Sequence, residues 1–220
     1  MGIQVKICGI ASPDAVDAAA RAGADFAGLV FFPKSPRRLK REQAIALASR
    51  LRGRCRLVAL VADANDTDIE TAVEAARPDF LQLHGRETPD RVAAVKARFG
   101  LPVIKSIAVA DATDLATVPG YERVADMLLF DARAPENAQR PGGHGAAFDW
   151  QLLRGRSFTK PWLLAGGLNA ENVARAIRAS DASAVDVSSG VETAPGVKSP
   201  DLIRDFIAAA RNARFAGAQA

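Results

Sequence analysis

Two side chains in this sequence have the chemistry and the position needed to move protons. Cys8 ends the β-favouring run of residues 5–8, and Gly9 and a helical pattern follow it. Asp131 directly follows the apolar run of residues 127–130. If both runs are parallel strands of one barrel, the two side chains lie at its carboxyl end, where barrel enzymes place their catalytic groups. We therefore predict that Cys8 is a general base and Asp131 a general acid.

Each of these roles depends on the surroundings of the side chain. A thiol acts as a base only as the thiolate, which nearby positive charge favours. Lys6 lies two residues before Cys8, so in a strand the two side chains point to the same face. Asp131 must be protonated in the substrate complex, which requires that exclusion of water or a negative charge raise its pKa. The alternatives are a small buried residue for Cys8 and a loop cap for Asp131.

Small residues follow the last two apolar runs of the chain. They are Gly166, Gly167, Ser188, Ser189 and Gly190. Glycine lets backbone N–H groups approach an oxyanion, and the loops after strands seven and eight of many barrels bind phosphate. Glycines that merely turn the chain are the alternative. Because such residues occur in both neighbouring loops, together with serines, we favour a phosphate site.

Two further polar side chains follow earlier apolar runs. Arg37 comes after two prolines and a serine, and a guanidinium group can hold a carboxylate with two hydrogen bonds. The alternative for Arg37 is a solvated arginine, which we assume for Arg38. His84 follows the run of residues 80–83 and has two equally supported roles, a hydrogen bond to substrate or one to loop backbone.

The elements that must position these side chains alternate between strand and helix patterns. Strands are expected over residues 5–8, 26–32, 56–62, 80–83, 101–107, 127–130, 162–165 and 184–187. Helices are expected from residue 15 and over residues 41–51, 66–76, 88–99, 112–117, 170–179 and 199–210. Eight strands alternating with eight helices is the count of an α/β protein with a single (β/α)8 TIM barrel. The unit with no helix range is the sixth, whose long connection of residues 131–148 breaks the rhythm.

A doubly wound open sheet is the competing architecture, but it rarely needs eight strands in a chain of 220 residues. No linker rich in Pro, Gly or Ser divides the sequence. We therefore expect residues 1–220 to form one barrel domain, with residues 211–220 as a frayed tail.

Composition argues against several other classes of protein. No apolar run approaches the roughly 20 residues that cross a bilayer, and the N-terminus has no secretory signal pattern. The two cysteines, Cys8 and Cys55, and the two histidines show no metal-ligand spacing. We assign no role to Cys55, and we expect a cytoplasmic protein that holds no metal.

The net charge of +4 is modest. Its basic clusters, at residues 37–41 and 50–56, lack the interleaved aromatic residues typical of nucleic-acid binding. We expect solvated helix surfaces there, no nucleic-acid or membrane partner, and an anionic small molecule as ligand.

The chain resembles the phosphoribosylanthranilate isomerases of tryptophan biosynthesis. The matching stretches occur in the family's order over almost the whole chain, and they are residues 6–10, 31–37, 81–85, 129–131, 142–145, 148–150, 165–173 and 185–192. The combination is specific to that family, although no single stretch is.

The resemblance implies a cofactor-free Amadori rearrangement of N-(5-phosphoribosyl)anthranilate. By this analogy, Asp131 protonates the furanose ring oxygen and Cys8 removes the proton from C2′ of the opened sugar. Arg37 faces the anthranilate carboxylate, and the loops after strands seven and eight hold the phosphate. One departure is His144, which replaces the small hydroxyl residue common in the family. A monomer is expected, and a homodimer is the alternative.

Two rival functions fit the sequence less well. A non-catalytic barrel that binds phosphorylated sugars would lack the acid or the base, and both are present. The second rival is the histidine-pathway aminoaldose isomerase, which performs the same rearrangement on the same barrel. That family looks to use paired aspartates, which follow strands one and five. Here strand one ends in Cys8, and no acid follows strand five before Asp111. Dual specificity remains open.

Overall fold

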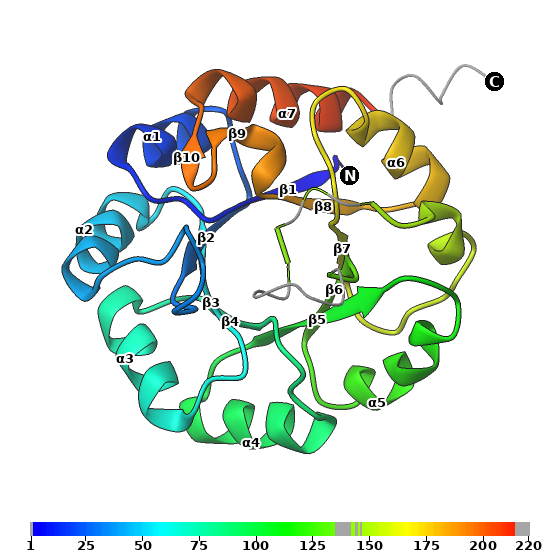
Figure 1. The fold of residues 1–220 in the computed structure, drawn as a ribbon, viewed down its shortest axis with the longest axis horizontal. Helices are drawn as coiled ribbons and strands as arrows, with labels where there is room; N and C mark the ends of the chain where they lie inside the picture. The colour runs from blue at the N-terminus through cyan, green and yellow to red at the C-terminus, as the bar shows by residue number, and fades with distance from the viewer. Residues whose placement is uncertain (1, 135–141, 144, 146, 214–220) are drawn as a thin grey trace.

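The computed structural model describes residues 2–134, 142, 143, 145 and 147–213. Eight parallel strands form one closed barrel in the order of the sequence. They are β1 (Gln4–Cys8), β2 (Phe26–Val30), β3 (Arg56–Val61), β4 (Phe80–Leu83), β5 (Val103–Val109), β6 (Met127–Ala132), β7 (Trp162–Leu164) and β8 (Ala184–Val187). The ring of strands lies inside a ring of helices (Figure 1). The predicted (β/α)8 TIM barrel is confirmed.

The described residues form seven α-helices rather than the eight expected. They are α1 (Pro13–Arg21), α2 (Arg41–Leu51), α3 (Asp66–Ala76), α4 (Pro89–Phe99), α5 (Val118–Glu122), α6 (Val173–Ser180) and α7 (Pro200–Asn212). The unit after β6 has a 3-10 turn, Trp150–Leu153, in place of a helix. Asp149 caps this turn by accepting a hydrogen bond from the backbone N–H of Gln151 at 3.0 Å.

Side-chain caps explain why several helix starts were predictable. Ser12, Asn65, Thr88 and Ser199 each precede a helix and accept a backbone N–H of its first turn. Proline follows three of these caps, which suits the first helical position because that position needs no N–H donor.

Several predicted strand bounds differ from the structure by one or two residues, and three of the differences have a consequence or a clear cause. β2 stops at Val30, and a bridge from Val30 to Arg38 replaces its expected continuation. β5 begins two residues later than expected, because Pro102 has no N–H to donate to a neighbouring strand. β6 runs on to Ala132, so Asp131 lies within the strand and not after it.

The predicted tail also begins too early, since α7 includes residues 211–212. The rest of that segment, residues 214–220, lies outside the described residues.

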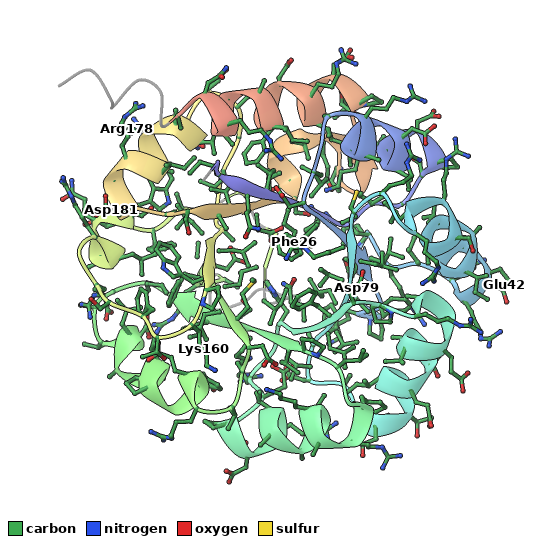
Figure 2. The ribbon with its side chains drawn as sticks, turned by 180° about the vertical axis from the view of Figure 1, so that it is seen from behind. Phe26, Glu42, Asp79, Lys160, Arg178 and Asp181 are labelled. Carbon is green, nitrogen blue, oxygen red and sulfur yellow. The ribbon has the colours of Figure 1, made fainter. Side chains whose placement is uncertain are left out.

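Apolar side chains fill two separate spaces. The larger core lies between the strands and the helices. A second cluster fills the interior of the barrel, with Phe26, Val58, Ile104 and Leu129 among its members. Figure 2 shows Phe26 toward the centre of the ring and Glu42, Arg178 and Asp181 at its outer edge. The packed interior supports the site at one end of the barrel.

A hairpin that the sequence analysis did not predict follows β8. Its strands are β9 (Glu192–Ala194) and β10 (Val197–Lys198), and they pair antiparallel with Lys198 opposite Glu192. No helix of the described residues is long and apolar enough to cross a membrane.

Candidate active site

One pocket at the carboxyl end of the barrel strands collects nearly all of the predicted site residues. Its lining includes Cys8, Arg37, His84, Asp131, Gly166, Gly167, Ser188 and Ser189. Gly190 is the one predicted site residue that is not part of this lining, and it packs against the loop after β7. In the closed barrel, β7 and β8 separate the strand of Cys8 from that of Asp131. The pocket therefore lies between the two predicted proton-transfer groups.

The thiol of Cys8 is buried beside an ion pair. Lys6 donates to Asp186 Oδ1 at 2.9 Å, and both side chains are almost fully buried. A Cβ atom on Gly28 would lie 3.2 Å from Cys8 Sγ and 3.4 Å from Lys6 Nζ. Glycine at position 28 thus lets the neighbouring strand lie close to both groups. As predicted, Lys6 and Cys8 share one face of β1.

The net effect of these surroundings on Cys8 differs from the expectation. Burial raises the pKa of the Cys8 thiol, and Asp186 raises it further. Lys6 and Lys198 lower this pKa but do not offset the burial. The thiol of the free protein is therefore mostly protonated at neutral pH. Once deprotonated, such a thiolate is a stronger base than a free cysteine.

The pKa of Lys6 moves upward. Burial, the largest single effect, favours its neutral form, but Asp186 and Cys8 together outweigh it. Lys6 therefore keeps its positive charge at neutral pH, and it can stabilise a negative charge that develops on Cys8.

A chain of hydrogen bonds leads to Asp131 from inside the barrel. His84 Nε2 lies 3.2 Å from Asp131 Oδ2, and Gln82 Nε2 lies 2.8 Å from His84 Nδ1. When the Gln82 amide donates to Nδ1, the ring proton is on Nε2 and points to Asp131. His84 therefore contacts Asp131 and Gln82. It also lines the pocket, so the predicted hydrogen bond to substrate stays a prediction.

Gln82 was missed by the sequence analysis, although its position in β4 contains a usable signal. It lies two residues before His84 and so points to the same face of the strand. Its side chain is completely buried, and its Oε1 is without a hydrogen-bond partner among the described residues. A buried amide inside a barrel is costly unless it is needed, which makes it a candidate for a functional role.

Arg37 is buried and fully engaged on one edge, in contrast to a solvated arginine. Its Nε and Nη2 donate to the two carboxylate oxygens of Glu192 at 2.7 and 2.8 Å. Lys198 donates to the same carboxylate at 2.7 Å. Glu192 lies within one of the matching stretches, where no role was predicted for it, and Lys198 was not among the predicted site residues. No local pattern connects either residue with Arg37, because Glu192 is 155 positions away.

The two glycine-rich loops pack closely enough to exclude larger residues. Gly166 and Gly167 have φ angles of +87° and +65°, which L-residues rarely adopt. A Cβ atom on Gly190 would lie 1.9 Å from the carbonyl oxygen of Leu168, in the neighbouring loop. The Ser188 hydroxyl donates to the backbone carbonyl of Cys8 at 3.1 Å. The loops after β7 and β8 therefore form a single wall of the pocket.

Among the described residues, no group of three or more His, Cys, Asp or Glu side chains is arranged to hold a metal ion. His144, whose contacts were left open, lies outside the described residues.

Fold and pocket together define a TIM-barrel enzyme that acts on a small molecule at the carboxyl end of its strands. The family model for N-(5'phosphoribosyl)anthranilate (PRA) isomerase matches residues 5–209. The N-(5'-phosphoribosyl)anthranilate isomerase of Rhodopseudomonas palustris is 55% identical over 97% of this chain and 100% of its own length. The chain belongs to the PRA isomerase family and is an isomerase of tryptophan biosynthesis.

Solved structures agree with this assignment. The crystal structure of phosphoribosyl anthranilate isomerase from Thermotoga maritima has a TM-score of 0.85 and 34% identity, over 96% of this chain and 99% of that one. A second crystal structure of such an isomerase, in complex with reduced 1-(o-carboxyphenylamino)-1-deoxyribulose 5-phosphate, has a TM-score of 0.82 and 32% identity, with the same coverage.

Proposed function

We propose that this isomerase carries out an Amadori rearrangement of N-(5-phosphoribosyl)anthranilate, with Asp131 as general acid and Cys8 as general base. The observation that carries the proposal is that the two residues, separated by β7 and β8, line one pocket. A substrate between them receives a proton on one side and loses one on the other.

Ring opening comes first. Asp131 donates a proton to the furanose ring oxygen as the bond from that oxygen to C1′ breaks. The lone pair of the anthranilate nitrogen forms a C=N bond with C1′, which gives a protonated Schiff base. His84, hydrogen-bonded to Asp131 Oδ2, holds the carboxyl group in place for this transfer.

Proton abstraction follows. Cys8 removes the proton from C2′, and the electrons of that C–H bond form a C1′=C2′ double bond while the Schiff base nitrogen becomes neutral. The resulting enolamine takes up a proton at C1′ while its 2′-hydroxyl gives one up, which yields the 2′-ketone. Asp131 has given one proton and Cys8 has taken one, so the reaction is an isomerisation without net loss of atoms. Lys6 supports this step because its charge lowers the pKa of Cys8 and so increases the amount of thiolate that can act as the base.

Binding groups hold the two ends of the substrate. The loops after β7 and β8 suit a phosphate, because glycines expose backbone that can approach its oxygens. Arg37 suits the aromatic carboxylate, since it lines the pocket and is positively charged. Support for an anionic aromatic phosphosugar also comes from the ligand of the related crystal structure.

Cys8 is tested by an assay on freshly made N-(5-phosphoribosyl)anthranilate that follows the loss of its fluorescence. We expect wild-type protein to consume the substrate and Cys8→Ser to be slower by about 10²–10⁴-fold, the usual contribution of a positioned base. Cys55→Ser is the matched control, because Cys55 lies outside the pocket. Near wild-type turnover by Cys8→Ser would show that another group removes the proton.

The proposed location of the enzyme is the cytoplasm. Its two free cysteines suit that reducing compartment.

The proposed oligomeric state is a monomer in solution, although a relative from Thermotoga maritima is described as dimeric. Sedimentation of the purified protein distinguishes the two states.

A further inference from the structure

Arg37, Glu192 and Lys198 form a buried cluster at the edge of the pocket. Their side chains are 5%, 5% and 1% exposed. Arg37 lines the pocket, whereas Glu192 and Lys198 lie behind it. Lys198 also donates to the backbone carbonyl of Ser188 at 2.8 Å, which ties the cluster to the loop after β8.

The geometry of the Arg37 guanidinium leaves only one end for a ligand. Glu192 occupies the edge formed by Nε and Nη2. The group is planar and rigid, so fixing that edge also fixes the direction of Nη1. A Cβ atom on Gly143 would lie 2.6 Å from Nη1, so glycine at that position leaves room for the guanidinium end.

The cluster has a net formal charge of one positive unit. Two cations share one carboxylate in a buried place, while Lys6 nearby is already paired with Asp186. Burial of an unbalanced charge costs free energy. One anionic group on a ligand at Arg37 would bring the formal charge of the cluster to zero. Burial alone would raise the pKa of Glu192, but Arg37 and Lys198 outweigh it, so the pKa is lowered and the carboxylate is ionised at neutral pH.

The β9–β10 hairpin lies against Arg37 and supplies the other two residues of the cluster. It places Lys198 opposite Glu192 in its own register. Its turn residue Gly196 has a φ of +85°, and a Cβ atom there would lie 2.7 Å from the carbonyl oxygen of Pro36. The hairpin thus packs against the loop that carries Arg37.

We propose that Glu192 is a positioning residue that determines specificity: by holding Arg37, it selects substrates with a carboxylate on the aromatic ring. This inference rests on the role proposed above for Arg37, and it assigns a function to the β9–β10 hairpin. Glu192 acts through Arg37 and does not touch the substrate itself.

The test compares two substrates on four proteins. The substrates are N-(5-phosphoribosyl)anthranilate and N-(5-phosphoribosyl)aniline, which lacks the carboxylate. The proteins are wild type, Glu192→Gln, Arg37→Ala and the double variant. Glu42→Gln serves as control, because Glu42 is an exposed carboxylate on the outer edge of the ring (Figure 2).

Glu192→Gln replaces one acceptor oxygen with an amide N–H₂ that cannot accept from Arg37. We expect kcat/KM for the anthranilate substrate to fall about 10–100-fold, mainly through KM, since a hydrogen bond to a charged group is weakened. Values for the aniline substrate should stay within about threefold of wild type, as should all values for Glu42→Gln. Addition of Glu192→Gln to Arg37→Ala should cause no further loss of discrimination, because coupled residues are not additive.

Two results would overturn the inference and can be told apart. In the first, Glu192→Gln loses activity equally on both substrates, whereas Arg37→Ala loses activity only on the anthranilate substrate. Glu192 would then be merely structural. Equal losses for Arg37→Ala itself would remove the proposed role of Arg37 and this inference with it. If Glu192→Gln does not fold, Glu192→Asp keeps the charge and shortens the side chain, and it is expected to show the same selective loss on a smaller scale.

Discussion

At the scale of single residues, the site places a protonated thiol next to a charged lysine. Burial raises the pKa of Cys8, whereas Lys6 opposes that rise only in part. The thiolate form of Cys8 is therefore weakly populated in the free protein, but it is a strong base once it forms. The pair of Lys6 and Asp186 thus keeps a compensating charge within reach of Cys8 without leaving that charge unpaired.

This environment predicts how Cys8 reacts with iodoacetamide in a Cys55→Ser background. Only the thiolate reacts, so the rate should rise with pH with a midpoint above that of free cysteine, near 8.5. Glutathione measured in parallel gives the reference profile. The position of the midpoint, not the absolute rate, is diagnostic, because burial also slows access. A midpoint below that of glutathione would mean that Lys6 dominates the thiol.

At the scale of elements, the loops after β7 and β8 depend on close contact between their backbones. Gly190 has no room for a side chain against Leu168. We therefore expect Gly190→Ala to separate the two loops and to weaken inhibition by inorganic phosphate and binding of substrate, with KM raised by about tenfold or more.

Gly120→Ala is the control, because a Cβ atom there meets only ordinary contacts at 3.4 Å and beyond. Its KM should match wild type. If Gly190→Ala also keeps the wild-type KM and phosphate affinity, the glycine-rich loops do not form the phosphate site.

A buried ion pair outside the pocket connects the loop after β4 to β5. Lys105 donates to Glu87 at 2.6 Å, and Glu87 also accepts from the backbone N–H of Asp63 and of Gly85. Burial favours the neutral form of Glu87, but Lys105 and the backbone donors outweigh it and lower the pKa of this carboxyl group. The pair braces the loop on which His84 and Gly85 lie.

Glu87→Gln should lower the free energy of unfolding by about 3–5 kcal/mol, because Lys105 is then buried without its partner. A lowered pKa in the folded state gives stability that is present above the pKa of the unfolded chain, near 4.3, and that is lost as pH falls. The wild-type protein should therefore lose stability between about pH 5 and 3 more steeply than the variant. Urea denaturation across this range measures both effects.

Glu74→Gln breaks an exposed pair with Arg41 and is the matched control, with a change below about 1 kcal/mol. Equal losses for Glu87→Gln and Glu74→Gln would show that the buried pair is not a brace.

At the scale of the whole molecule, local patterns were enough to predict the barrel. The bounds predicted for α2, α3, β4 and β8 agree with the structure, because buried runs and helix caps are local features of the chain. The same patterns placed Cys8 and Asp131 at one end of the barrel, since parallel strands bring their carboxyl ends together.

Contacts between distant parts of the chain could not be predicted in this way. Asp186 is 180 residues from Lys6, and Glu192 is 155 from Arg37. The effect of burial on Cys8 depends on side chains that only the closed barrel brings together. The count of eight helices included the unit after β6, where the long connection of residues 131–148 breaks the sequence rhythm, and the described residues there have a capped 3-10 turn instead.

The central claim, that Asp131 opens the ring and Cys8 then takes the proton from C2′, is tested most directly by a kinetic isotope effect. Turnover of N-(5-phosphoribosyl)anthranilate with deuterium at C2′ is compared with turnover of the unlabelled substrate, which has ordinary hydrogen there. Cys8→Ser slows proton abstraction, so this variant should show a full primary isotope effect on kcat. Asp131→Asn slows ring opening, which leaves the C2′–H bond intact, so its turnover should be the same for both isotopes. A full isotope effect in Asp131→Asn, with none in Cys8→Ser, would contradict the assignment of the two residues.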